Sequence, residues 1–235
     1  MSSTVQRIAE NVARVRDAIQ RAAQRSQRRA DEIRLIAVSK YVDTDVIEAL
    51  LEAGCHDLGE SRPQHLWKKA EELVQRPVHW HMIGHLQRNK ARRTLPWIDL
   101  LHAGDSVRLL ETVNQLSVES DRTCQVLIEV NVSGDEAKHG FRPEQVPDVL
   151  EQAAQWPGLR ICGLMAMARW GSEPEEARYD FIALRQLRDR LVGTVPDQVR
   201  LDHLSMGMSG DFEVAIEEGA TMVRVGSALF EGVGD

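Results

Sequence analysis

Apolar residues follow two alternating patterns along the chain, and the first is that of a long amphipathic helix. Val5, Ile8, Val12 and Val15 are spaced three and four residues apart, which predicts a helix over residues 4–28 with arginines on its outer face. Short runs of aliphatic and β-branched residues then alternate with further helical patterns. Each of these units predicts a strand followed by a helix.

The short apolar runs define eight strands. They cover residues 34–39, 57–59, 78–84, 98–102, 125–132, 159–166, 201–205 and 221–225. Amphipathic helices are expected between them over residues 44–53, 63–75, 106–119, 143–156, 174–191 and 211–218, together with a short basic helix after the third strand.

Strands that alternate with helices pair in parallel through crossover connections. Eight such units predict an α/β fold, a closed (β/α)8 barrel of the TIM type, in a single domain over residues 1–235. A doubly wound open sheet is the alternative. Only residues 227–235 follow the last strand, which is too few for a full eighth helix. We therefore expect a shortened C-terminal end, with the extra N-terminal helix covering the gap.

Composition narrows the class of protein. The chain has 235 residues, 43% of them apolar, so it can bury a sizeable core. A net charge of −7 argues against nucleic-acid binding, and the basic run at residues 88–93 is expected to be a solvated helix face. Three scattered cysteines fit a reducing compartment rather than a disulfide framework or a zinc site. No stretch is apolar enough to span a membrane, so we expect a cytoplasmic protein.

Functional groups of a barrel gather at the C-terminal ends of its strands. Lys40 follows the first strand, and partial desolvation there would favour the neutral amine that a Schiff base needs. The alternative is a strand-end lysine whose ammonium extends into water.

Glycine and serine follow the last two strands, where barrels often bind phosphate. Ser205 to Gly210 form a Ser-x-Gly-x-Ser-Gly segment, and Gly226 and Ser227 follow the eighth strand. Backbone amides and hydroxyls at these two positions predict an anion site beside Lys40.

Histidines cluster around the third strand. His79 and His81 point to one face of it, and His85 follows shortly after. No carboxylate set completes a metal site at the other strand ends, so we expect these side chains to form hydrogen bonds, with a metal site as the less favoured alternative.

Four segments carry a family resemblance. They are Ala-Val-Ser-Lys at residues 37–40, Gly-Glu-Ser at 59–61, Trp-His-Met-Ile-Gly-His-Leu-Gln-Arg-Asn-Lys at 80–90, and Leu-Ser-Met-Gly-Met-Ser-Gly-Asp at 204–211, with residues 223–230 behind the last. In this order they resemble the YggS/PROSC family of pyridoxal phosphate homeostasis proteins.

The resemblance implies a barrel related to the N-terminal domain of alanine racemase, with pyridoxal 5′-phosphate (PLP) as its cofactor. It implies that Lys40 forms the Schiff base and that Arg224 faces the pyridine nitrogen. It also implies that Lys138, in the loop at residues 136–140, lies near the site. The remaining cofactor-binding residues are Ser205, Gly226 and Ser227 at the phosphate, Gly207 and Ser209 nearby, and Asn131 and Met165 beside the cofactor.

Two departures from the family pattern bear on that site. Ser61 stands where the family commonly has asparagine, which puts a contact with the cofactor ring in doubt; Ser61 is nevertheless expected near it. Tyr41-Val42-Asp43 replaces the usual Thr-Lys-Pro, so a second lysine is missing. That loss would alter cofactor loading or release.

Arg224 favours a carrier over an enzyme. A guanidinium cannot accept a proton, so the pyridine nitrogen would stay unprotonated and the ring would be a weak electron sink. The sequence therefore predicts a non-catalytic, monomeric protein of PLP homeostasis that buffers the cofactor or delivers it to client enzymes. The alternatives are a small amino-acid racemase or related PLP enzyme, and an aldolase that forms its Schiff base without cofactor.

Overall fold

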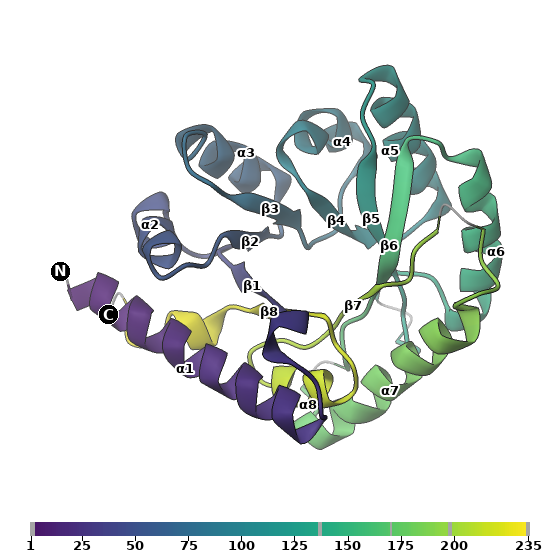
Figure 1. Cartoon of the computed structure of the whole chain (residues 1–235). Coiled ribbons are helices and arrows are strands. Elements are labelled where there is room, and N and C mark those ends of the chain that lie inside the picture. Colours follow the sequence, from purple (N-terminus) through teal and green to yellow (C-terminus); the bar gives the residue numbers. More distant parts are fainter. Residues whose placement is uncertain (1–2, 136–137, 170, 197–198, 234–235) are drawn as a thin grey trace.

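A computed structural model describes residues 3–135, 138–169, 171–196 and 199–233 of the chain. Over these residues eight parallel strands follow one another in chain order and close into a barrel (Figure 1). The strands are β1 (Arg34–Val38), β2 (Asp57–Glu60), β3 (His79–Met82), β4 (Leu100–Gly104), β5 (Cys124–Glu129), β6 (Leu159–Met165), β7 (His203–Ser205) and β8 (Met222–Val225). The predicted (β/α)8 barrel is confirmed, and the doubly wound alternative is wrong.

Helices pack around the outside of the barrel, one after each of the first seven strands. With the N-terminal helix they are α1 (Ser3–Arg25), α2 (Thr44–Glu52), α3 (Pro63–Glu72), α4 (Arg88–Thr94), α5 (Val107–Glu119), α6 (Val146–Gln152), α7 (Pro174–Leu191) and α8 (Phe212–Glu217). Between β8 and residue 233, where the described chain stops, the single helical element is the short 3₁₀ turn η5 (Ser227–Leu229). The shortened C-terminal end is thereby confirmed.

One predicted helix is interrupted where proline occurs. The segment at residues 143–156 divides into a 3₁₀ turn, η3 (Pro143–Gln145), the helix α6 and a second 3₁₀ turn, η4 (Ala153–Gln155). Pro147 stands in the first turn of α6, where its missing N–H costs nothing. A continuous helix from residue 143 would instead need that N–H as an internal donor.

The core has two parts, inside and outside the sheet. Inside the barrel, one apolar cluster fills the space between opposite strands. Its buried members are Ile36, Leu100, Ala103, Leu127, Cys162, Met165 and Met222. A larger cluster lies between the sheet and the helices, where alternate strand residues meet the apolar faces of the helices.

Helix α1 covers the side of the barrel that lacks a full eighth helix. It runs beside α8 and the last residues of the chain in Figure 1, as expected from the sequence. Asn11, only 2% exposed, donates hydrogen bonds to the carbonyls of Leu229 (3.1 Å) and Glu231 (2.9 Å). Arg28 donates to the carbonyls of Ile216 and Ala220 at 3.1 and 2.8 Å. Backbone acceptors in residues 216–231 are thus satisfied by α1 and by the segment that follows it.

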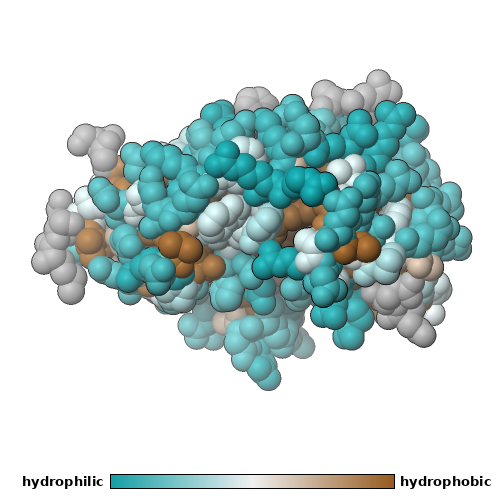
Figure 2. All heavy atoms as spheres, turned by 90° about the horizontal axis from the view of Figure 1, so that it is seen from above, coloured by the Kyte–Doolittle hydropathy of each residue, from teal (hydrophilic) through white to brown (hydrophobic). Residues whose placement is uncertain are grey.

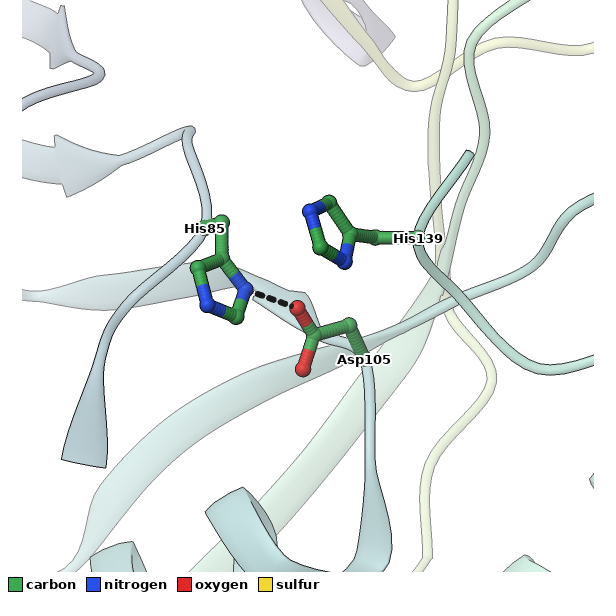
Figure 3. Close-up of side chains that lie close together, drawn as sticks. All are labelled: His85, Asp105 and His139. Atoms are coloured by element: carbon green, nitrogen blue, oxygen red, sulfur yellow. Dashed lines mark hydrogen bonds and ion pairs between the residues drawn. The ribbon is translucent and has the colours of Figure 1, made fainter. Parts of the chain in front are cut away.

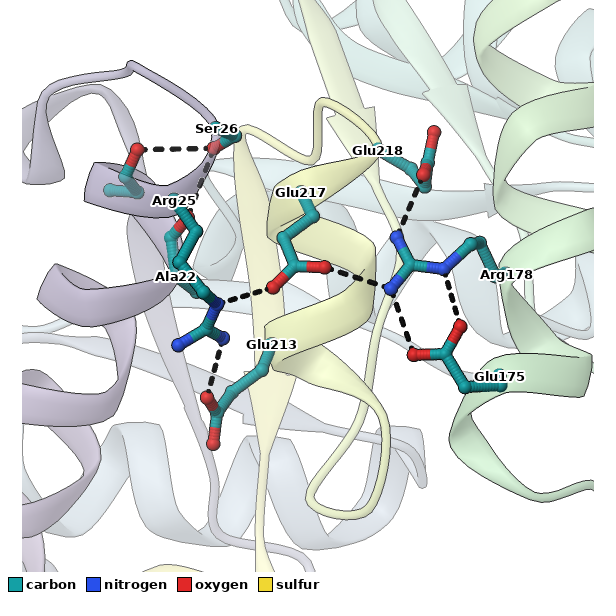
Figure 4. Close-up of polar contacts among 9 residues, drawn as sticks. Ala22, Arg25, Ser26, Glu175, Arg178, Glu213, Glu217 and Glu218 are labelled. Carbon is teal, nitrogen blue, oxygen red and sulfur yellow. Dashed lines mark hydrogen bonds and ion pairs between the residues drawn. The ribbon is translucent and has the colours of Figure 1, made fainter.

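An ion-pair network joins three helices on this side (Figure 4). Arg25 of α1 contacts Glu213 and Glu217 of α8 at 2.8 and 2.6 Å. Arg178 of α7 contacts the same Glu217 at 2.8 Å, and also Glu175 and Glu218. Because Glu217 is shared, the network fixes the orientation of α8 relative to both neighbours.

The surface is mostly hydrophilic, and on the face in Figure 2 apolar side chains form only small separate groups. The basic run at residues 88–93 falls on α4, where Arg92 and Arg93 are exposed and pair with Glu119 and Glu71. It is the solvated helix face expected from the sequence. Among the described residues, no helix combines the length and the apolar character needed to cross a membrane.

Candidate functional site

Lys40 stands two residues beyond the end of β1, at the mouth of the barrel, meaning the rim formed by the C-terminal ends of the strands. Its side chain is half-buried, and Nζ lies 4.8 Å from the centroid of the Tyr41 ring. In the part of the chain that the structure describes, Nζ makes no hydrogen bond or ion pair. Its amine is therefore not committed to a carboxylate, which suits a nucleophile.

A second lysine, Lys69 of α3, is buried beneath this position. Lys69 Nζ lies 2.6 Å from Glu60 Oε2 and donates to the carbonyl of Ser39 at 2.7 Å. The two charged side chains are 8% and 0% exposed. Glu60 Oε1 accepts from the backbone N–H of Ser61 at 2.7 Å. This ion pair ties α3 and the end of β2 to the residue before Lys40.

Ser61 lies beside the third strand's loop. A Cβ added to Gly84 would lie 2.4 Å from the Ser61 carbonyl oxygen, so only glycine permits this approach. The Ser61 side chain is half-buried. Its contact with a cofactor stays a prediction.

The loops after β7 and β8 form one unit. Gly226 N–H donates to Ser209 Oγ at 3.0 Å, and Arg224 N–H donates to the Gly207 carbonyl at 3.0 Å. Gly207 has φ +91°, and a Cβ there would lie 2.6 Å from that of Ala215. Since only glycine fits this turn, the loop lies close against α8. Ser227 is exposed at the start of η5.

Arg224 points into the barrel and is 4% exposed. Burial lowers the pKa of its guanidinium to about 10, although the charges of Glu129 and Asp211 oppose the shift. Nη1 donates to Ser205 Oγ at 2.6 Å and Nη2 to the Ala166 carbonyl at 3.0 Å. Nε donates to none of the described residues. This buried charge is held by neutral acceptors and retains donors for a ligand.

A buried hydrogen-bonded chain, here called the interior chain, continues from Arg224 through the barrel. Ser205 Oγ lies 2.9 Å from His102 Nδ1, and His102 Nε2 lies 3.0 Å from His81 Nδ1. The interior chain ends at Asp57, whose Oδ1 lies 2.9 Å from His81 Nε2. Ser205, His102 and His81 are at most 1% exposed. Asp57 is 25% exposed at the opposite end of the barrel.

Proton positions along the interior chain follow from its two ends. Arg224 can only donate and the Asp57 carboxylate can only accept. Burial, aided by the charge of Arg224, lowers the pKa of His102 well below its ordinary value, so its ring is neutral. Arg224 therefore donates to Ser205, and His81 Nε2 donates to Asp57. The predicted contact of Ser205 with a phosphate stays a prediction.

The other predicted residues serve loops or the core. Asn131 Nδ2 donates to the Asp135 carbonyl at 2.8 Å, within its own loop. Met165 is fully buried in the cluster inside the barrel, where it pairs in register with Ser205. Lys138 donates to the Ala168 carbonyl at 2.9 Å and so joins the loops after β5 and β6. Two residues of its predicted loop, Glu136 and Ala137, lie outside the described residues.

Comparison with known proteins identifies the family. Residues 11–233 match the model of the alanine racemase N-terminal domain. A relative from Aquifex aeolicus, a pyridoxal phosphate homeostasis protein, is 40% identical over 94% of this chain and 96% of its own. This chain belongs to the pyridoxal phosphate homeostasis protein family.

Two solved structures of similar chains agree with this assignment to the family. The structure of PipY from Synechococcus elongatus with PLP bound has a TM-score of 0.82 and 35% identity, covering 95% of this chain and 99% of PipY. The structure of an unknown protein from Bifidobacterium adolescentis has a TM-score of 0.93 and 36% identity, covering 98% of this chain and 97% of that protein. Family membership and the barrel fold are thus supported along nearly the whole chain.

Several residues of this family member's site escaped the sequence analysis. Lys69 is one, although it shares the buried stripe of α3 with Leu66 and Ala70. A lysine in an apolar stripe is a usable signal of a buried ion pair. His102 is another, and its only signal was its inward position on a strand. The sequence does not reveal the partners of these two residues, because the partners lie on other elements. Lys69 pairs with Glu60 of β2, and His102 contacts residues of β3 and β7.

Glu129, at the end of β5, is a buried acid at the same mouth and is 4% exposed. Burial, and next the charge of Asp105, raise the pKa of its carboxyl from 4.5 to about 7. Arg224 and His85 oppose this shift but do not cancel it. Glu129 therefore loses its proton near neutral pH.

The first prediction concerns the buried ion pair. Lys69→Met leaves Glu60 buried without its partner and should lower the free energy of unfolding by about 3–5 kcal/mol. Adding Glu60→Gln removes that charge but keeps an acceptor for the Ser61 N–H, so the double variant should regain much of the loss. Lys68→Met breaks an exposed pair with Glu72 (3.8 Å) on the same helix and should cost less than about 1 kcal/mol. Urea denaturation measures all three; equal losses in the two single variants would refute the prediction.

The second prediction concerns the interior chain. Ser205→Ala deprives Arg224 Nη1 and His102 Nδ1 of their shared partner and should cost about 1–3 kcal/mol of stability. Ser120→Ala, which removes an exposed hydroxyl at the end of α5, is the control and should change stability by less than about 0.5 kcal/mol. Urea denaturation without ligand measures both, and a Ser205→Ala variant as stable as the control contradicts the assigned contacts.

The third prediction concerns Glu129 and pH. Its folded-state pKa exceeds the unfolded value, so its contribution is full below pH 4.5 and is lost as pH rises through about 7. The loss amounts to roughly 3 kcal/mol. Glu129→Gln should abolish it, making the variant relatively more stable at pH 8 than at pH 5. Urea denaturation at both pH values, in wild type and variant, measures the difference; parallel pH profiles would rule the effect out.

Proposed function

We propose that this chain binds PLP and serves PLP homeostasis, holding the cofactor as a Schiff base on Lys40 and releasing it to client enzymes. The observation that carries the proposal is the position of Arg224. This buried cation lies on β8, the strand that leads to Gly226, and its side chain has N–H donors that no described residue accepts. Support comes from the PLP-bound structure of PipY, a protein 35% identical to this one.

The residues present fit the two ends of the cofactor. Lys40 offers an uncommitted amine for the aldehyde carbon. The loops after β7 and β8 offer Ser209, Gly226 and Ser227 for the phosphate, with Gly207 permitting a close turn. Strands β1 and β8 are neighbours, so the amine and the phosphate loops share one arc of the mouth.

Arg224 determines what such a site can do. PLP supplies an electron sink for carbanions at an amino-acid Cα, and the sink is strong when the pyridine nitrogen is protonated. Facing that nitrogen, Arg224 could only donate to it and would keep it unprotonated. The interior chain holds the guanidinium in place through Ser205. These residues favour storage and transfer of the cofactor over catalysis.

The proposal predicts a visible absorption band when PLP is added to the protein. Borohydride reduction followed by peptide mass spectrometry should find the label on Lys40, and Lys40→Ala should lose both band and label. Lys40 and the exposed Lys68 line a common cavity of about 360 Å³. Lys68→Ala is therefore the control and should keep both the band and the label. An equal label in Lys40→Ala would refute the assignment. A colourless wild type would favour a Schiff-base aldolase without cofactor.

Turnover separates a carrier from an enzyme. Alanine and serine incubated with the PLP-loaded protein in D2O should show no exchange at Cα above that of free PLP. Enzymatic exchange that is lost in Lys40→Ala would instead identify an amino-acid racemase or a related PLP enzyme. Either outcome is compatible with binding of PLP on Lys40, so this experiment tests only the use of the cofactor.

A further inference from the structure

Three side chains from different strand ends converge at the mouth of the barrel (Figure 3). His85 follows β3, Asp105 follows β4 directly, and His139 lies between β5 and β6. His85 Nδ1 lies 2.5 Å from Asp105 Oδ2. The imidazole rings of His85 and His139 are stacked, with centroids 4.4 Å apart and planes 10° from parallel. One nitrogen of each ring and one carboxylate oxygen lie within 4.8 Å of one another.

The environment of the three residues suits a ligand set. The Asp105 side chain is 3% exposed, and its second oxygen, Oδ1, accepts from Ser106 Oγ at 3.1 Å. A carboxylate held in this way has a fixed orientation, as metal-binding carboxylates commonly have. Both histidines are exposed, so a dissolved ion can reach them and their rings can rotate.

We propose that His85, Asp105 and His139 bind a divalent transition-metal ion, with Zn²⁺ as the best match. Two imidazole nitrogens and one carboxylate oxygen are a donor set that zinc takes in sites with an open fourth position. Zinc bonds of about 2.0–2.2 Å require donor atoms about 3.3 Å apart. Rotation of the exposed histidines closes the remaining distance, and the ion replaces the proton between His85 and Asp105.

The other histidine–acid contacts of the described chain lack this combination. His81 and Asp57 belong to the interior chain, where both histidine nitrogens are committed. His79 lies 3.7 Å from Asp99, and both are exposed. Within the described residues, only the His85 cluster brings three potential ligands together. His79 is therefore a matched control: an exposed histidine near a carboxylate without a third ligand.

The metal site and the proposed PLP site use different residues. In the closed barrel, β3, β4 and β5 form the arc opposite β7, β8 and β1. The open metal position would hold a water molecule or a carboxylate-bearing ligand entering the mouth. Because no residue is shared, either proposal can fail without the other.

Metal titration of the full chain, without and with PLP, tests the site. Zn²⁺ followed by calorimetry should bind at one equivalent, and Co²⁺ should give visible bands of a tetrahedral site without a thiolate charge-transfer band. His85→Ala and His139→Ala should each weaken Zn²⁺ binding at least about tenfold. His79→Ala should leave it unchanged. Because both histidines are exposed, the alanine variants should fold normally. Their melting temperatures should therefore match that of the wild type.

Three outcomes would overturn the proposal. They are no binding of either ion at one equivalent, binding that persists unchanged in His85→Ala and His139→Ala, and a Co²⁺ spectrum with thiolate bands. The last would assign the metal to a cysteine, such as the partly exposed Cys124. Asp105→Asn adds a stricter test, because it retains the shape of the buried side chain and removes only its charge.

Discussion

Pairing between β1 and β8 is the constraint on which the site depends. Four residue pairs, from Arg34 with Met222 to Ala37 with Val225, close the barrel across almost the whole chain. Closure brings the end of β1, which leads to Lys40, beside the loop at Gly226. A Cβ added to Gly226 would lie 3.4 Å from the Cβ of Val38. An open sheet would leave Lys40 and the loops after β7 and β8 at opposite edges. Their proximity comes from the hydrogen bonds of this one seam.

Two buried cations near the mouth are stabilised in different ways. Lys69 has a full counterion in Glu60, at a contact of 2.6 Å, and adds a backbone carbonyl. Arg224 has neutral acceptors, and its nearest acids, Glu129 and Asp211, act on it only through their charges. The first arrangement neutralises the buried charge. The second leaves donors unused, which is the property expected of a group that awaits a ligand rather than one that serves only the fold.

The fold was largely predictable because periodicity reports burial directly. The strands and the helices follow from residues whose neighbours lie three, four or two positions away. The covering role of α1 follows from the few residues after the last strand. Within the candidate site, the sequence itself marks Lys40 and the glycines at 207 and 226, and their part in cofactor binding stays a prediction. Contacts across the barrel were not predictable, since Ser205 and His102 are 103 residues apart. For the same reason His85 was considered as a metal ligand without Asp105 and His139, which complete the cluster from other strand ends.

The contacts of α1 also order the events of synthesis. A ribosome makes this helix before the strands of the barrel, and α2 follows soon enough to pack against part of it. The carbonyls to which Asn11 donates, those of Leu229 and Glu231, are made only after all eight strands. A nascent chain therefore carries an incompletely covered amphipathic helix through most of translation, with apolar surface exposed to chaperones and to other chains. Docking of α1 and closure of the barrel become a single late event, which can be completed only when residues up to Glu231 have emerged.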